Sequence, residues 1–575
     1  MLVSRILVAV LVGLLAVGPA FGRTSAIDSC QKRIHDVDPS RSLFVTERAV
    51  LEHPDMFTLE DLLNEIAEDS GDPTLDALTI WKQWWDTQNE DIPGESLELG
   101  AHCDDQVDPQ DPSVRTINGF PIDCPRNEGR EVGLNPFGGD AAHYALIALV
   151  NRFDLAPEKG ENCGEYRAIF ARVGGSGGGS GGGGIDPGGL GGPVPIDAVL
   201  KGDPIGTRSQ GAQDAEGSER GGVIFAGDRN LVIFEAVLPN PSRRCGLNGC
   251  RAIAEHWEKL STQAFDDPGD RARALKTFFI DGLEEKRVEP VVKLAHYSKG
   301  TGQIRTNQFM SSDFSDETVL PQEWQLREFK LAQLCTAGPN PRCKLRVVPV
   351  SVKVNPFVGL FGTEHASSAA FKDDFVDQVV NLRKRNLNTF GLQVKNLYNA
   401  GQSTSEDDRE FYTDMLVREP DAQFERDIEA AAFPANLSAA QILNRAHVNS
   451  CAGCHEPIDT DLGDGLVWPG SLRFTHVSES SESPPGHFEI SEALRDVFLP
   501  HRERVFERYL NNRPCRKCTP AYLAGSMEPV STPSSAIVVG EGESLTIRSD
   551  ELQALDAALK EGVSERNLGG SSRVH

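Results

Sequence analysis

Hydrophobic residues recur along the chain with two different periods, and the period changes twice between the ends of the chain. Helical spacing predicts helices over residues 58–69 and 74–88. The strongly apolar residues 141–154 also predict a helix. Residues 166–173 and 231–238 are rich in β-branched and aromatic side chains, so they predict strands. The first part of the chain therefore combines helices with at least two strands.

The second part of the chain is mainly strand-forming and the third mainly helical. After two helices at 251–263 and 271–283, alternation predicts antiparallel strands at 288–297, 303–310, 324–333 and 345–354. Helical patterns then occupy residues 371–387, 407–417, 424–431 and 438–447. This order predicts an α+β class: a mixed body with antiparallel strands and helices, followed by a mainly α-helical C-terminal region.

A glycine-rich segment interrupts the first part of the chain. Residues 174–192 contain 13 glycines in 19 positions. Glycine has no side chain to bury and loses the most backbone entropy on ordering, so this segment cannot form a packed core. We expect a flexible insertion in a long connection between neighbouring strands.

The N-terminus has the pattern of a secretory signal peptide. Arg5 precedes an apolar run over residues 6–17, and Ala20 and Gly22 place small residues at a cleavage site after Gly22. This predicts a signal peptide over residues 1–22 and a periplasmic or secreted protein. No later stretch is apolar enough to predict a membrane span.

Composition agrees with export. The 575 residues include 57 basic and 85 acidic side chains, a formal net charge of −28. Such a surface argues against a nucleic-acid partner, which needs a basic footprint over the phosphates. Twelve cysteines are many for a reducing cytosol, so we expect disulfide bonds and an oxidising compartment.

The most informative motif is Cys451-Ala452-Gly453-Cys454-His455. C-x-x-C-H is the attachment signature of c-type haem, in which both thiols bond the porphyrin and the histidine is the proximal iron ligand. From the composition, the motif is expected by chance about 0.006 times in this chain. A disulfide between the two cysteines, or half of a zinc site, is the alternative interpretation.

At this motif the chain resembles c-type cytochromes. Residues 447–457 (HVNSCAGCHEP) look like the start of a single-haem cytochrome c domain. Residues 149–157 and 233–241 look similar to segments of uncharacterised exported bacterial proteins with such a motif after a large body. The resemblance implies one covalent haem c, and a division into a body (23–430), a cytochrome c-like haem region (431–530) and a C-terminal helix and tail (531–575).

The distal iron ligand has two candidates. His476 lies 21 residues after His455 in a short strand-like segment, and Met527, the only methionine after the motif, lies 72 residues after it. We favour His476. An iron with an open distal face is the third alternative, and would permit peroxide or oxygen chemistry. Trp468 and Phe474 are predicted walls of the haem pocket.

Three functions are compatible with these residues. The first is an exported electron carrier that docks an unidentified redox partner protein. The second is a haem-dependent oxidoreductase of peroxidase or oxygenase type, and the third is a surface or binding protein with a structural haem domain. Residues 491–518 hold seven basic and four acidic groups, so they could steer an acidic partner or simply form a solvated helix face.

Ten cysteines remain beside the haem pair, an even number as full disulfide pairing requires. Two pairs are close enough in sequence to close small loops, Cys245 with Cys250 and Cys335 with Cys343. Cys103 and Cys124 fall in a polar loop region, where they are plausible disulfide partners. Cys515 and Cys518 form a second C-x-x-C, but Thr519 follows where a haem site needs histidine.

Overall fold

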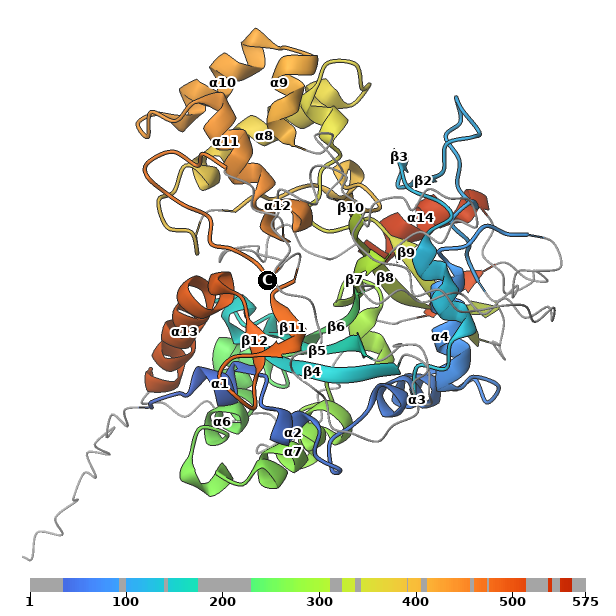
Figure 1. Ribbon diagram of the computed structural model, residues 1–575, viewed down its shortest axis with the longest axis vertical. Helices are drawn as coiled ribbons and strands as arrows, with labels where there is room; N and C mark the ends of the chain where they lie inside the picture. Colours follow the sequence, from blue (N-terminus) through green and yellow to red (C-terminus); the bar gives the residue numbers. More distant parts are fainter. Residues whose placement is uncertain are drawn as a thin grey trace, which may run out of the picture.

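The computed structural model describes residues 35–92, 100–138, 143–173, 229–310, 323–336, 343–389, 391–404, 411–455, 460–472, 475–512, 536–539 and 549–560. Within these residues the fold is α+β, as expected, with helices packed around a nine-stranded sheet (Figure 1). The predicted signal peptide and the glycine-rich segment lie outside them.

The strands of the large sheet follow the order β1-β4-β5-β6-β7-β8-β10, with β9 and β13 also paired to β8. Their bounds are β1 Phe44–Val45, β4 His143–Arg152, β5 Asn162–Val173, β6 Arg229–Pro239, β7 Gln303–Met310, β8 Glu323–Thr336, β9 Cys343–Val350, β10 Ser403–Thr404 and β13 Ala536–Val539. All pairings are antiparallel except that of β13 with β8. Two small antiparallel pairs join β2 (Thr116–Ile117) to β3 (Phe120–Pro121) and β11 (Val477–Glu482) to β12 (Phe488–Ile490).

The helix predicted over residues 141–154 is wrong, because this segment forms β4. Strand β4 is buried on both sides over most of its length and pairs with β1 and β5. A strand buried on both faces has a continuous apolar sequence, which periodicity cannot distinguish from a buried helix. Pairing with neighbouring strands therefore decided this element.

The other predicted strands are confirmed with one exception. The neighbours β5 and β6, on either side of the glycine-rich segment, pair antiparallel as expected. The strand predicted over residues 288–297 is wrong. Pro290 has no amide hydrogen for a ladder, and the amides of Val291 and Val292 donate to the carbonyls of Phe278 and Phe279 instead.

Most of the predicted helices are confirmed, and several begin at a capping residue. Thr58 and Ser438 each form a capping box at the N-terminus of α3 and α11. The α-helices are α1 Pro39–Ser42, α2 Arg48–Leu51, α3 Leu59–Ser70, α4 Ala77–Asp86, α6 Arg251–Lys259, α7 Pro268–Lys276, α8 Ser368–Leu382, α9 Met415–Arg418, α10 Ala422–Ala432, α11 Ala439–His447, α12 Cys451–His455, α13 Leu499–Asn511 and α14 Ser549–Lys560.

The two faces of the central strands differ sharply, and the strand register assigns each residue to its face. One face, here called the apolar face, carries Tyr166, Phe170, Val232, Phe234, Ile304 and Phe329. The ring centroids of Trp84 of α4 and Phe234 lie 5.8 Å apart, and the ring of Trp257 of α6 stacks on that of Tyr166. The opposite face, here called the charged face, carries Glu165, Arg167, Ile169, Ile233, Glu235, Arg305 and Glu328.

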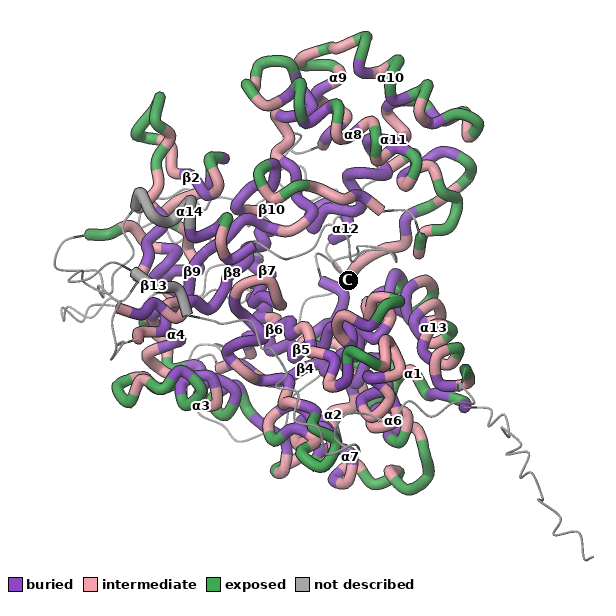
Figure 2. Tube along the Cα trace, turned by 180° about the vertical axis from the view of Figure 1, so that it is seen from behind, coloured by how far each residue is buried: buried purple, intermediate pink, exposed green. Residues whose placement is uncertain are grey.

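Residues after 430 contribute to the same core as the strands. The main hydrophobic cluster extends from Val37 to Leu510, and Figure 2 shows the central strands β5 to β8 largely buried. A second cluster joins α8, α10 and α11 into a helical layer, and Figure 1 shows α12 between this layer and the sheet. The part of the chain that the structure describes contains no helix long and apolar enough to cross a membrane.

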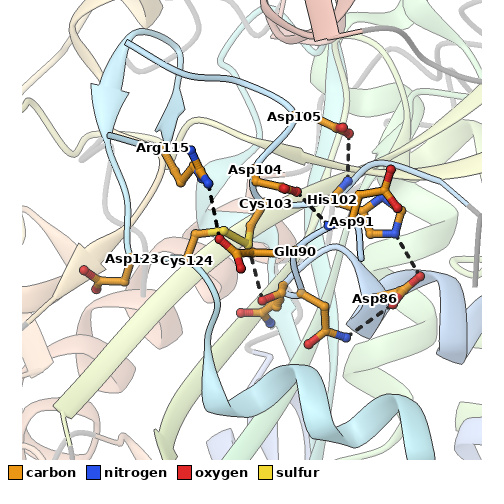
Figure 3. The surroundings of a disulfide bond; sticks show 12 residues. Asp86, Glu90, Asp91, His102, Cys103, Asp104, Asp105, Arg115, Asp123 and Cys124 are labelled. Atoms are coloured by element: carbon orange, nitrogen blue, oxygen red, sulfur yellow. Dashed lines mark hydrogen bonds and ion pairs between the residues drawn. A yellow bond between two sulfur atoms is a disulfide. The ribbon is translucent and has the colours of Figure 1, made fainter. Parts of the chain in front are cut away.

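Among the described residues, disulfides join Cys103 to Cys124, Cys163 to Cys250 and Cys335 to Cys343. The predicted loop between Cys245 and Cys250 is wrong, because Cys250 packs beside Cys163 of β5, 87 residues away. Cys245 is disulfide-bonded as well. Cys103 lies next to a buried ion pair in which His102 Nε2 is 3.1 Å from Asp86 Oδ2 (Figure 3). One disulfide therefore closes the loop region between Cys103 and Cys124, and the other two involve strands of the large sheet.

Candidate functional site

The C-x-x-C-H motif forms the short helix α12, directly after α11. Ser438 and Gln441 form the capping box at the start of α11. Three residues separate the end of α11 from the start of α12. Gly453 fits closely here, since a Cβ atom at this position would lie 2.1 Å from the backbone oxygen of His447. The position between the two cysteines must therefore be glycine for α12 to approach α11 this closely.

Both motif cysteines are buried, and neither is in a disulfide. Cys451 packs in a small cluster with Trp324 and Leu326 of β8. Burial raises the pKa of the Cys451 thiol to about 12, although nearby Arg305 acts in the opposite direction. The thiol is therefore protonated at neutral pH, unlike the reactive cysteine of a thiol oxidoreductase.

His455 and His476 lie 21 residues apart in the sequence and close together in the structure. Their ring centroids are 4.7 Å apart, and the His455 ring stacks on Trp324 with a centroid distance of 5.0 Å. His476 Nδ1 lies 2.8 Å from the hydroxyl oxygen of Ser491, while its Nε2 lies 3.5 Å from Cys454 Sγ. The hydrogen bond to Ser491 fixes the ring so that Nε2 points toward the motif.

Both histidines line one cavity between the charged face of the sheet and the segments that cover it. The cavity has about 550 Å³ of empty space, a figure that includes the part open to solvent. Its walls combine charged and apolar side chains. They are Phe44, Val150, Arg167, Ile169, Leu231, Ile233, Glu235, Arg305, Asn307, Leu326, His455, His476, Val477, Leu494 and Arg502.

The floor of the cavity is a row of buried ion pairs across the strands. Arg305 of β7 reaches Glu235 of β6 at 3.2 Å and Glu328 of β8 at 2.5 Å. Arg167 of β5 reaches Glu235 at 3.1 Å and also pairs with Glu165. Burial raises the pKa of Glu328, but the neighbouring cations Arg305 and Lys560 outweigh this effect, and the net pKa falls well below its usual range.

Sequence inspection missed this row, although a signal was present. Charged residues alternate with apolar ones within the predicted strands, as at Glu165 and Arg167 or at Glu235. Alternation of this kind ordinarily indicates one solvated face. Here the C-terminal segments cover that face, so that Glu235, Arg305 and Glu328 are almost completely buried.

Arg502 of α13 was also missed as a site residue. The sequence places it in the basic stretch 491–518, as a partner-steering or solvated residue. Of that stretch, Arg504 and Arg508 are exposed, but Arg502 is only 3% exposed and lines the cavity. Burial and the nearby Arg152 lower its pKa well below the usual range.

The remaining predicted site residues fall into two groups. Met527 and Phe474 lie outside the described residues. Trp468 is buried and its ring lies 5.9 Å from that of Phe498, but it is not part of the cavity wall. His447, at the end of α11, packs against Phe411 and Tyr412 and does not line the cavity.

Comparison with known proteins gives no family: no protein-family model, curated protein or solved structure matches the chain.

The residues around the cavity have the chemistry that a covalent haem requires. Two thiols outside any disulfide lie on one helical turn, and two imidazoles line the same cavity. The Nη2 atom of Arg502 is buried without a hydrogen-bond partner, so a cation there could receive a carboxylate of the porphyrin. In the described ranges, no group of three or more His, Cys, Asp or Glu side chains could hold a bare metal ion.

Proposed function

We propose that the protein is an exported c-type cytochrome with one covalent haem, and that it transfers electrons. The observation that carries this proposal is the pairing of His476 with His455 in one cavity, next to the two cysteines of the motif. Cys451 and Cys454 would hold the porphyrin through thioether bonds, and His455 would be the proximal ligand. The three disulfides agree with an oxidising compartment, periplasmic or extracellular.

The position of His476 favours electron transfer over oxygen or peroxide chemistry. Its Nδ1 is engaged by Ser491, and its Nε2, which lies 3.5 Å from Cys454 Sγ, would be the distal ligand. A haem with two histidine ligands has no open coordination position for a substrate, so its chemistry is the gain and loss of one electron. Ser491 is then a positioning residue, because it acts on the iron only through His476.

The protein matrix contributes orientation and electrostatics. Trp324 stacks on His455 and would fix the plane of this ring. The buried ion pairs of the charged face set a strong local field, and the burial of His455 and His476, at 5% and 8% exposure, would limit the access of water to an iron bound between them. Both features tune the potential of a haem at this place.

The direct test is production of the full chain with the machinery for haem attachment. We expect a covalent haem that persists in denaturing gels, and low-spin absorption and EPR spectra in both oxidation states. Cys451→Ala together with Cys454→Ala should abolish attachment. The matched control is Cys335→Ala with Cys343→Ala, which removes the disulfide between β8 and β9 and leaves the motif intact.

Substitution of the histidines separates the functions. His476→Ala should convert the iron to a high-spin form that binds carbon monoxide, whereas the wild type should not bind it. A wild-type protein that is high-spin and reacts with peroxide would favour the oxidoreductase. A protein that carries no covalent haem despite the attachment machinery would contradict the proposal.

A further inference from the structure

Arg502 is a buried cation without a partner, and it lines the cavity. The side chain is 3% exposed, and its Nη2 atom has no hydrogen-bond partner. An arginine stays charged at any physiological pH, and a buried charge without a counter-charge lowers the stability of the fold. A cation in this position therefore indicates an anion that the protein chain itself does not supply.

The nearby carboxylates cannot fill this role, because other cations already engage them. The pairs are Asp154 with Arg152 at 3.0 Å, Glu235 with Arg167 and Arg305, Glu165 with Arg167, and Glu328 with Arg305 and Lys560. Lys353 lies in the same electrostatic environment and adds further positive charge. The charges that act on Arg502 are the cations Arg152 and Arg167 and the carboxylates Asp154 and Glu165, and both carboxylates already pair with one of these cations.

Part of the cavity lining is apolar. Phe44, Val150, Ile169 and Leu494 contribute to it from four different elements. An inorganic anion would leave these side chains without contacts, whereas a ligand with an apolar body and a carboxylate would cover them and neutralise the arginine.

We propose that the cavity binds a carboxylate at Arg502, with the apolar body of the ligand against the wall formed by Phe44, Val150, Ile169 and Leu494. Two sources have this chemistry. One is a propionate of the covalent haem, and this version rests on the proposed function. The other is a free amphipathic carboxylic acid, which would make the cavity a ligand site in its own right.

The first arm of the test uses the full chain produced without the haem-attachment machinery. Benzoate is the probe and benzamide its neutral isostere, with thermal unfolding and calorimetry as measurements. Benzoate should raise the unfolding midpoint and benzamide should not. Arg502→Gln should abolish the shift, Arg502→Lys should keep part of it, and Arg508→Gln, an exposed position on the same helix, should keep all of it.

The second arm uses the haem-loaded protein and measures the reduction potential. If the porphyrin supplies the carboxylate, Arg502→Gln should lower the potential, because a propionate without its cation favours the ferric iron. Arg508→Gln should leave the potential unchanged, and added benzoate should no longer bind. If benzoate still binds the loaded wild type and Arg502→Gln does not alter the potential, the source is a free acid.

The outcomes of the two arms are distinct. Absence of covalent haem overturns the proposed function, and the benzoate arm then decides the carboxylate site alone. Haem attachment with no effect of Arg502→Gln in either arm overturns the carboxylate site and leaves the proposed function in place. Circular dichroism of Arg502→Lys and Arg502→Gln identifies any loss that comes from misfolding.

Discussion

The two faces of the central sheet are buried to the same degree but are built from opposite chemistry. The apolar face packs aromatic rings against aromatic rings, as where Trp84 lies between Phe234 and Phe329. The charged face buries a row of carboxylates and guanidinium groups under the C-terminal segments. Burial of apolar surface is sufficient to explain the composition of the apolar face, because apolar contacts stabilise a fold wherever they form.

The charged face needs another explanation. Buried ion pairs contribute little net stability, because desolvation offsets the attraction between the charges. An apolar face of the same size would stabilise the fold at least as well. The charged face is also where His455, His476 and Arg502 line the cavity. We therefore infer that the apolar face contributes most of the stability, and the proposed ligand site lies on the charged face.

Truncation on the apolar face should have the largest effect on stability. Trp84→Ala removes a fully buried ring that contacts Trp81, Trp85, Phe234 and Phe329. We expect a loss of about 4–5 kcal/mol in the free energy of unfolding, measured by urea titration. Trp84→Phe should recover much of the loss. A loss below about 1 kcal/mol would show that the rings are not a rigid core.

Removal of a paired cation from the charged face should have a slightly smaller effect. Arg305→Met leaves Glu235 and Glu328 with fewer partners in a buried position. We expect a loss of about 3–4 kcal/mol in the free energy of unfolding at pH 7. The exposed Arg508→Met serves as the control and should stay within about 0.5 kcal/mol of the wild type.

His256 should make the apolar face sensitive to acid. Burial lowers its pKa to about 4, and its ring stacks on Phe278. The unfolded chain binds a proton near pH 6.5 and the folded chain only near pH 4. Stability from the neutral ring is therefore complete above pH 6.5 and is lost as the pH falls toward 4.

The corresponding variant is His256→Phe, which cannot be protonated. Between pH 7 and pH 4, the wild type should lose about 3 kcal/mol more than this variant in the free energy of unfolding. Urea titrations at four pH values across this interval measure the difference. Equal pH dependence of the two proteins would mean that His256 is hydrated in the folded state.

The smallest expected effect has the opposite sign. Arg502→Met removes the cation that has no partner, so the haem-free protein should gain about 1 kcal/mol or more in the free energy of unfolding. Urea titrations of Arg502→Met and Arg305→Met, each compared with the wild type, measure the two effects. A destabilising Arg502→Met would mean that Arg502 has a structural role like that of Arg305, and the distinction between paired and unpaired cations would fail.

The sequence alone determined the local features of this protein. The capping boxes at Thr58 and Ser438, the strands β5 to β9 and the loop between Cys335 and Cys343 all depend on residues close together in the chain. The C-x-x-C-H motif belongs to the same class, because one helical turn sets the geometry of its side chains.

Only the tertiary structure decided the features that depend on distant partners. Strand pairing made β4 from an apolar run that could equally form a helix, and packing beside β5 joined Cys250 to Cys163. The approach of His476 to His455 and the burial of Arg502 belong here as well. Such features follow from which surfaces cover one another, and residue spacing along the chain does not contain that information.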